Sequence, residues 1–241
     1  GEDIVNMNYA AVDAGGNAVV KVEVPAEWAN IVVKEEEHTA DAARPDFVKK
    51  IVDPINALKG DLLPVSAFNG REDGTWDNGT AAYEKRGIAV NVPEWKIGNC
   101  IQCNQCAYVC PHAVIRPFLA TEEEAAASGV EWKQGLGETK EYKFRIQISP
   151  MDCTGCSNCV DVCPAKDKAL VMRPLEEQMP QQKNWDYITK NIGYKQVVDK
   201  TKSVKNLQFA QPLFEFSGAC AGCGETPYIK AISQLFGDKM M

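Results

Sequence analysis

The sequence contains 241 residues, of which 45% are hydrophobic and 24% are charged, and its 33 acidic and 26 basic side chains give a net charge of -7 at pH 7. These values are ordinary for a globular protein and exclude collagen-like and wholly disordered chains. An acidic chain is a poor partner for nucleic acid. No apolar run approaches the roughly 18 residues of a membrane span, and the N-terminus lacks the build of a signal peptide. We therefore expect no nucleic-acid partner, no membrane partner and a cytoplasmic location.

The N-terminal region is predicted to begin with a helix. Apolar residues from Ile4 to Val12 recur at helical spacing, and a second apolar run ends at Pro25. The chain starts at Gly1, almost inside the helical pattern, so we interpret the sequence as a fragment of a longer polypeptide.

Four further elements are predicted before the cysteines begin. Residues 34–45 carry an acidic run and are expected to form a solvated connector, which leads to a short helix over residues 47–55. Three turn signals predict an ordered loop at residues 69–79. Apolar residues alternate over residues 88–92 and predict a half-buried strand that ends at Pro93.

Three elements are predicted within and after the cysteine region. Thr121, followed by acidic residues, has the pattern of a capped helix start, and Gly129 is expected to end that helix. Alternation over residues 144–148 predicts a second strand. Near the end, a helix is predicted over residues 226–236 and is closed by Gly237. Its apolar face consists of Ile229, Ile232, Leu235 and Phe236.

All ten cysteines lie between Cys100 and Cys223. Thiols gathered in this way in a cytosolic chain favour metal binding over disulfides. Two segments repeat one spacing, in which three cysteines separated by two residues each are followed, after three more residues, by Cys-Pro. The first run contains Cys100, Cys103, Cys106 and Cys110, and the second run contains Cys153, Cys156, Cys159 and Cys163.

This spacing is that of paired [4Fe-4S] clusters, in which the fourth cysteine of each run binds the other cluster. Three thiolates on one tight loop can reach three corners of a cube, whereas the fourth corner faces away from the loop. We therefore assign one cluster to Cys100, Cys103, Cys106 and Cys163, and the other to Cys153, Cys156, Cys159 and Cys110. The alternatives are two zinc sites with four cysteines each, which rarely need this spacing, and a disulfide framework, which is weaker still.

The similarity of the two runs extends beyond their cysteines. Related tails follow at residues 113–117 and 169–174 and support two halves with pseudo-twofold symmetry. Apolar neighbours such as Ile101 and Val114 suit a dry shell around the clusters, in which backbone N–H groups bond to sulfur.

Cys220 and Cys223 remain after the two runs are complete. Two thiolates cannot hold a cubane, so by spacing alone the pair is either a redox dithiol or half of a third metal site that is completed elsewhere. Neighbouring glycines favour the close approach of a bulky group or of backbone.

Three stretches together resemble the family of pyruvate:ferredoxin oxidoreductases, which use thiamine diphosphate. Residues 63–68, 73–75 and 83–89 are similar to the small Glu-Lys-Arg module that precedes the ferredoxin segment in that family. The two cysteine runs follow in the expected place. Residues 216–228 are similar to the opening of the thiamine-binding domain, and the resemblance covers nearly the whole chain.

The resemblance implies an electron-relay segment of a larger enzyme. Such an enzyme decarboxylates pyruvate oxidatively with coenzyme A to acetyl-CoA and CO2, and it passes electrons through [4Fe-4S] clusters to ferredoxin or flavodoxin. The implied partners are the remainder of the oxidoreductase, the electron acceptor, pyruvate and coenzyme A, in a homo-oligomer. No residue of this segment is assigned a catalytic role, so activity would need a longer chain or complex.

The resemblance also implies roles for three residues near the C-terminal end. Cys220 and Cys223 would be two ligands of a third [4Fe-4S] cluster, and Glu225 would contact thiamine diphosphate, which the full enzyme binds with Mg. The other ligands of that cluster, the Mg-diphosphate motif and the pyruvate-binding domain are missing from this sequence. Glu84, Lys85 and Arg86 are interpreted as a salt-bridged surface, not a site.

The predicted fold class is α+β, with a 2[4Fe-4S] ferredoxin-like domain that carries an inserted helix and strand and is flanked by partial pieces of larger α/β domains. The predicted parts are the tail of a gamma-type oxidoreductase domain (1–28), a connector (29–65), the Glu-Lys-Arg module (66–97), the ferredoxin domain (98–178), and a linker with the start of the thiamine-diphosphate-binding domain (179–241).

Two other classes of function stay open at this point. One is a stand-alone ferredoxin-type carrier or a cluster-wire subunit of another redox complex, which would have no use for the segment from Cys220 to Pro227. The other is a zinc-stabilised interaction module, which analysis of iron and acid-labile sulfide would distinguish.

Overall fold

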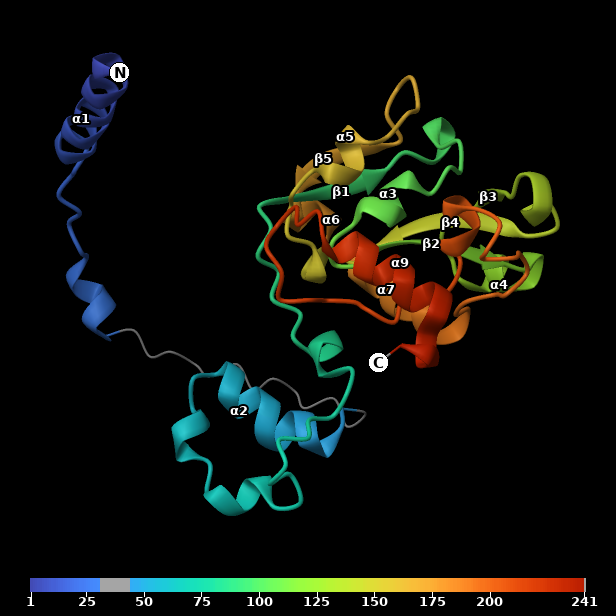
Figure 1. The fold of residues 1–241 in the computed structure, drawn as a ribbon, viewed down its shortest axis with the longest axis horizontal. Helices are drawn as coiled ribbons and strands as arrows, with labels where there is room; N and C mark the ends of the chain where they lie inside the picture. The colour runs from blue at the N-terminus through green and yellow to red at the C-terminus, as the bar shows by residue number, and fades with distance from the viewer. Residues whose placement is uncertain (31–43, 241) are drawn as a thin grey trace. The chain divides into compact units, whose positions relative to one another are not determined.

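A computed structural model describes residues 1–30 and 44–240 of the chain (Figure 1). The chain divides into two compact units, residues 1–43 and residues 44–241. Among the described residues, no helix combines the length and the apolar character needed to cross a membrane.

The first unit contains one long helix. This helix, α1 (Glu2–Asn17), buries none of its side chains, and a 3-10 turn follows at Ala26–Asn30. The helix predicted at the N-terminus is therefore confirmed. The predicted connector at residues 34–45 lies almost wholly outside the described residues.

The second unit begins with short helical turns. A π-helical turn (Val48–Val52) continues into α2 (Asp53–Asn56), and Val48, Ile51 and Val52 are its buried residues. The predicted helix over residues 47–55 is confirmed. Residues 69–79 contain no helix or strand and form consecutive turns, which confirms the predicted loop.

Two antiparallel sheets lie in the part of the second unit that carries the cysteine runs (Figure 1). One contains β1 (Asn91–Trp95) and β5 (Leu170–Pro174), with Val92 opposite Arg173. The other has the order β2-β4-β3 and contains β2 (Ile115–Ala120), β4 (Lys143–Ile148) and β3 (Lys133–Gln134).

The strand pairing joins the two sequence halves. Each cysteine run lies between two strands, β1 and β2 for the first run and β4 and β5 for the second. The strand before one run pairs with the strand after the other, as β1 with β5 and β4 with β2. This exchange is the pseudo-twofold relation that the repeated tails predicted.

The strand predicted at residues 88–92 is displaced in the structure. Ile88 and Val90 are 67% and 81% exposed, and the strand begins only at Asn91. It then continues through Pro93, which was predicted to end it. Proline is tolerated here because β1 has only one neighbouring strand, so a missing N–H can face away from the ladder.

The strand predicted at residues 144–148 is confirmed as β4, and the prediction of the capped helix is confirmed as α4 (Glu122–Ala127). In α4, Thr121 accepts a bond from the Glu124 amide (3.2 Å), and the Glu124 carboxylate accepts one from the Thr121 amide (2.7 Å). β4 is buried on both faces, because it is the central strand of its sheet and α7 (Pro180–Asn191) packs against it.

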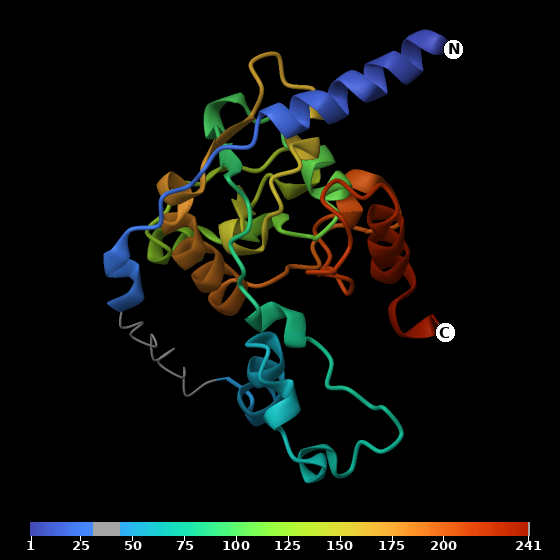
Figure 2. The ribbon, with the colours of Figure 1, turned by 90° about the vertical axis from the view of Figure 1, so that its left-hand side faces the viewer.

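The remaining helices are α3 (Gln105–Val109), α5 (Asn158–Asp161), α6 (Leu175–Gln178), α8 (Val204–Leu207) and α9 (Thr226–Phe236). Of these, α3 and α5 lie within the cysteine runs, and the others follow the second run. Figure 2 shows α7 (orange) and α9 (red) on opposite sides of the strands.

The predicted helix near the C-terminus is confirmed as α9, which Gly237 ends with φ +53°. Its packing differs from the apolar face that the sequence suggested. Ile229, Ile232 and Phe236 are between 37% and 55% exposed, and the polar Lys230 and Gln234 are buried. Polar groups can occupy this face because both donate to backbone carbonyls, Lys230 to Ala107 of the first run and Gln234 to Ala210.

Candidate metal centres

The two cysteine loops have the same backbone conformation. Two residues of each loop lie in the left-handed region, Gln102 and Asn104 in the first and Gly155 and Ser157 in the second, with φ between +59° and +70°. In each loop the second of these residues precedes a short helix, α3 or α5, that carries the third cysteine. The repeated spacing therefore corresponds to a repeated fold.

The first cavity lies beneath the first loop. About 330 Å³ of it is free of protein atoms, including space open to solvent, and its apolar lining includes Trp95, Ile146 and Leu170. Its sulfur-bearing residues are Cys100, Cys103, Cys106 and Cys163. Three of them come from the first run, and Cys163 comes from the second.

The second cavity has the same volume, about 330 Å³, and lies beneath the second loop. Its lining includes Val114, Ile115 and Met172. Its sulfur-bearing residues are Cys153, Cys156, Cys159 and Cys110. The structure thus brings the eight cysteines of the two runs into two groups of four, and the fourth cysteine of each run lines the cavity of the other.

The protein alone disfavours thiolates at three of these cysteines. Burial raises the pKa of Cys153 to about 12 and also raises the pKa of Cys106 and of Cys159, and neighbouring cysteines add to the effect. Buried thiols of this kind become thiolates only beside a strong positive charge, such as that of a metal. The two cavities are therefore suited to a cationic inorganic group.

Some N–H donors for sulfur are already in place. The amides of Val114, Gly155 and Ala169 lie 3.3 to 3.4 Å from the sulfur atoms of Cys110, Cys153 and Cys163. These are the backbone-to-sulfur bonds that stabilise negative charge on thiolates. Among the described residues, no three Cys, His, Asp or Glu side chains converge so as to bind a single metal ion.

The Cys220–Cys223 pair lies beside the second cavity. Cys220 is exposed and Cys223 is partly exposed. The Asn158 side chain of the second loop donates to the Gly222 carbonyl (3.5 Å), and a Cβ at Gly222 would lie 3.5 Å from the Cβ of Cys156.

Backbone amides favour a thiolate at Cys223. The N–H groups of Thr226 and Glu225 at the start of α9 lower the pKa of Cys223. Glu225 itself is exposed at the N-terminus of the helix. The structure therefore places Cys223 and Glu225 together, on the side of the molecule where the second cavity lies.

His112 connects the second cavity to the segment that leads to Cys220. Its ring is only 3% exposed and lines the cavity, and its Nδ1 donates to the Ser217 carbonyl (3.1 Å). Its own carbonyl accepts a bond from the Phe216 amide (3.0 Å). Burial lowers the pKa of His112, so the neutral ring is favoured.

Lys230 is a residue near the site that sequence reasoning missed. It is 2% exposed, and its ammonium donates to the carbonyls of Ala107, Tyr108 (3.0 Å) and Cys110 (3.3 Å). Its acceptors lie 120 or more residues away in sequence. No local pattern could have identified the contact.

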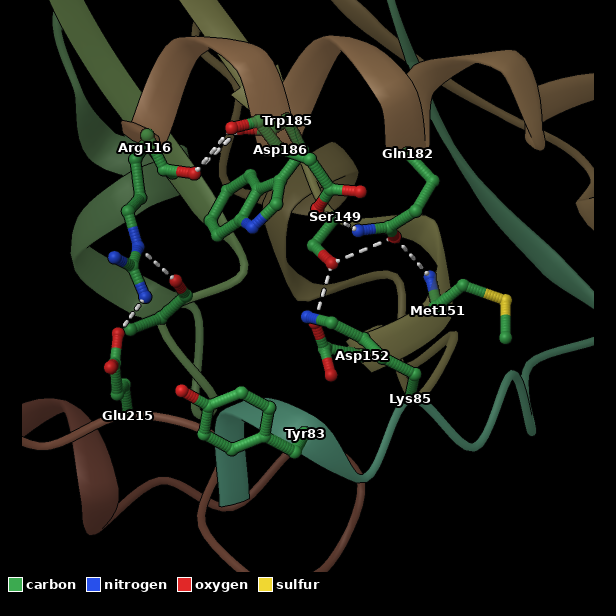
Figure 3. Close-up of polar contacts among 12 residues, drawn as sticks. Tyr83, Lys85, Arg116, Ser149, Met151, Asp152, Gln182, Trp185, Asp186 and Glu215 are labelled. Atoms are coloured by element: carbon green, nitrogen blue, oxygen red, sulfur yellow. Dashed lines mark hydrogen bonds and ion pairs between the residues drawn. The ribbon is translucent and has the colours of Figure 1, made fainter. Parts of the chain in front are cut away.

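Arg116 and Glu215 form a second long-range contact (Figure 3). The Arg116 guanidinium pairs with Glu215 and lies 4.7 Å from the ring centre of Trp185. Arg116 is on β2, the strand that follows the first run, and Trp185 is on α7. The ion pair between Arg116 and Glu215 therefore attaches the segment before Cys220 to this strand.

Two protein-family models match parts of the chain. Residues 33–89 match a family model described as EKR, a domain of unknown function, and residues 99–166 match the 4Fe-4S dicluster domain. The second unit therefore contains a ferredoxin-type domain within a mixed α/β structure, as the two cysteine runs predicted.

Similar proteins cover the whole chain. It is 51% identical to pyruvate-flavodoxin oxidoreductase of Enterobacter agglomerans and 52% identical to pyruvate:ferredoxin oxidoreductase of Moorella thermoacetica, in each case over 100% of this chain and 20% of the relative. It is 45% identical to the mitochondrial pyruvate dehydrogenase [NADP(+)] of Euglena gracilis, over 99% of this chain and 13% of the relative. The chain thus spans about one fifth of the first two relatives, and the predicted resemblance is confirmed: over its full length it is similar to a segment of the pyruvate:ferredoxin and pyruvate-flavodoxin oxidoreductases.

Proposed function

We propose that this chain is the electron-relay segment of a pyruvate:ferredoxin or pyruvate-flavodoxin oxidoreductase. The observation that supports this most strongly is the pair of cavities, each lined by four cysteines of which one comes from the opposite run. In the complete enzyme, pyruvate would be decarboxylated with coenzyme A to acetyl-CoA and CO2, and ferredoxin or flavodoxin would receive the electrons.

The residues of both cavities fit a [4Fe-4S] cluster. Each cavity offers four sulfur atoms, an apolar lining and backbone N–H groups directed at sulfur. The ligands would be Cys100, Cys103, Cys106 and Cys163 for the first cavity and Cys153, Cys156, Cys159 and Cys110 for the second. Because the cysteines surround a volume and do not converge on one point, a polynuclear cluster fits them better than a zinc ion. Bound there, each cluster would take up and release one electron at a time.

Cys220 and Cys223 are proposed as two ligands of a third [4Fe-4S] cluster. The lowered pKa of Cys223 and the exposure of Cys220 suit a site that other residues complete. Glu225, at the start of α9, is proposed to contact thiamine diphosphate. The contact of Gly222 with the second loop supports a relay that runs from the third cluster to the second cavity and then to the first.

We propose the same domain limits that the sequence predicted. Residues 1–28 would be the tail of the gamma-type domain, residues 66–97 the Glu-Lys-Arg module, residues 98–178 the ferredoxin domain, and residues 179–241 the linker and the start of the thiamine-diphosphate-binding domain. The complete enzyme is proposed to be a cytoplasmic homo-oligomer.

Metal and sulfide analysis tests the proposal directly. The natural polypeptide, purified without oxygen, is expected to contain about eight irons and eight sulfides for the two complete sites. If the third cluster is completed, about four more of each are expected. Zinc without sulfide would refute the electron-relay function.

A stand-alone ferredoxin-type carrier is the second candidate, because the two cavities alone would serve it equally well. The two candidates differ in the source of the electrons. In the relay, pyruvate with coenzyme A should reduce the clusters of the natural polypeptide, and Cys223→Ser should slow that reduction. In a plain carrier, only an external reductant should reduce them, and Cys223→Ser should have no effect.

A further inference from the structure

The Glu84-Lys85-Arg86 triplet separates into two different ion pairs. Glu84 and Arg86 pair with each other at 2.9 Å, and their side chains are 31% and 62% exposed. Lys85 pairs instead with Asp152, whose side chain is only 6% exposed. All three residues are thus in salt bridges, as predicted, but the partner of Lys85 lies outside the triplet and is buried.

Asp152 is fixed directly beside the second cavity. It precedes Cys153 in the chain, and its carboxylate accepts a hydrogen bond from the Ser149 hydroxyl (2.5 Å). The Gln182 side chain of α7 accepts a bond from the Met151 amide (3.3 Å) and lies 3.1 Å from the Ser149 hydroxyl (Figure 3). The carboxylate is thus fixed next to Cys153, the first cysteine of the second run.

The backbone around Lys85 lies against the turn that contains Asp152. Lys85 has φ +33°, a conformation that costs energy for a residue with a side chain. Two residues later, the Gly87 amide donates to the Met151 carbonyl (2.8 Å). At Gly87, where φ is +59°, a Cβ would lie 3.2 Å from the Met151 side chain. The triplet is therefore in close backbone contact with the turn that leads into the second run.

Lys85 also contacts the segment that leads to Cys220. Its ammonium lies 4.9 Å from the ring centre of Phe216, in a cation–π arrangement. The Phe216 amide in turn donates to the carbonyl of His112, which lines the second cavity. One cation thus contacts both chain segments that flank this cavity.

We propose that Lys85 neutralises Asp152 and thereby keeps the cluster of the second cavity reducible, which assigns a charge-compensating role to the EKR segment. The inference rests on the cluster assignment proposed above. An electron that enters a cluster adds one negative charge and makes or breaks no bond. Without Lys85, the Asp152 charge would oppose that electron, because burial weakens solvent screening. The first cavity is not expected to respond.

A charge-pair cycle in the natural polypeptide tests the proposal. Lys85→Met, Asp152→Asn and the double variant are loaded with clusters, and each cluster is titrated with dithionite while its EPR signal is followed. The signal that is missing in a Cys156→Ser variant identifies the cluster of the second cavity. Arg86→Gln is the matched control, because Arg86 belongs to the same triplet and pairs only with Glu84 among the ion pairs described.

Lys85→Met is expected to lower the equilibrium constant for reduction of the second-cavity cluster at least tenfold, which is about 59 mV for a one-electron couple. Asp152→Asn is expected to raise that constant, and the double variant to return within about threefold of the unmodified protein. Arg86→Gln should leave both clusters within the same threefold limit.

Two results would overturn the inference. One is an unmoved potential in Lys85→Met or in Asp152→Asn, and the other is an equal shift of both clusters. If Lys85→Met does not assemble, Asp152→Asn decides alone, since removal of the carboxylate must raise the potential. Iron and sulfide are measured first on the unmodified protein. Their absence would refute the proposed function, whereas intact clusters with unmoved potentials would refute only the role of Lys85.

Discussion

The two halves of the ferredoxin-type domain have identical cysteine spacing, but different parts of the chain complete them. In both halves a lysine satisfies the carbonyls at the end of the short helix. In the second half this is Lys168, which donates to Asp161 and Cys163, both at 2.9 Å and five to seven residues away. In the first half it is Lys230, from a helix more than 100 residues later.

The same contrast appears at the second residue after the first cysteine of each run. Gln102 donates to the Gln134 carbonyl (2.7 Å) and accepts from the Leu136 amide (3.1 Å). The first loop is thus hydrogen-bonded to the segment between β2 and β4, which contains α4 and β3 and is called the insertion below. The equivalent residue of the second loop is Gly155, whose added Cβ would lie 2.9 Å from the Asn91 carbonyl. A repeated cysteine pattern therefore does not give the two cysteine-lined cavities the same surroundings.

We expect the largest effect, on cluster content, from substitution of the fourth cysteine of a run. Cys110→Ser is expected to abolish the cluster of the second cavity and to spare that of the first, because Cys110 lines the cavity of the opposite run. For the two sites of the domain, iron should fall from about eight to about four per chain. EPR identifies the cluster that remains, and Cys163→Ser should give the mirror result. Loss of the cluster at Cys100, Cys103 and Cys106 in Cys110→Ser would contradict the crossed assignment.

The two lysines at the helix ends should differ in importance. Lys230→Met removes a buried cation from three carbonyls and is expected to cost about 2–4 kcal/mol of stability. Lys168→Met removes bonds that are local and partly exposed, and about 1 kcal/mol is expected. Anaerobic thermal unfolding of the cluster-loaded protein measures both. Equal melting temperatures for the two variants would show that α9 does not anchor the first half.

The next loss of stability is expected from substitution of Gly155 in the second loop. Gly155→Ala combines a left-handed backbone with a contact to the Asn91 carbonyl, and about 2–3 kcal/mol of destabilisation is expected. Gly129→Ala is the matched control, because Gly129 has a similar φ of +67° and open space around its Cβ position. About 1 kcal/mol is expected there, from backbone strain alone. If both variants have the same melting temperature, the contact with the Asn91 carbonyl of β1 is not the reason that glycine is needed at position 155.

The sequence could predict the two groups of four cysteines because their signal is local. Three cysteines on one loop, with a repeated spacing, determine both the loop and the need for a fourth ligand from elsewhere. The capping pattern at Thr121 is local as well, and it predicted α4 correctly. In contrast, the pairing of Lys85 with Asp152 spans 67 residues and leaves no trace in the spacing of either segment.

Periodicity failed where burial was decided by distant partners. The alternation at residues 88–92 predicted a strand, but the strand could begin only at Asn91, where β5 becomes available for pairing. In α9 the apolar positions suggested the packed face. Lys230 and Gln234 are buried there instead, because Lys230 donates to carbonyls of the first run and Gln234 donates to the Ala210 carbonyl. Satisfaction of buried carbonyls outweighed the burial of apolar area on that helix.

The insertion between the halves gives the smallest effect. Thr121→Ala removes the hydroxyl that accepts the Glu124 amide, and about 1 kcal/mol of stability should be lost, measured by thermal unfolding. Thr121→Ser keeps the acceptor and is the control. Because α4 packs against β2 and lines neither cavity, both cluster potentials should stay unchanged. A shift confined to the first cluster would instead mean that the insertion, through β3 and its contacts with Gln102, is part of the electrostatic surroundings that distinguish the first half from the second.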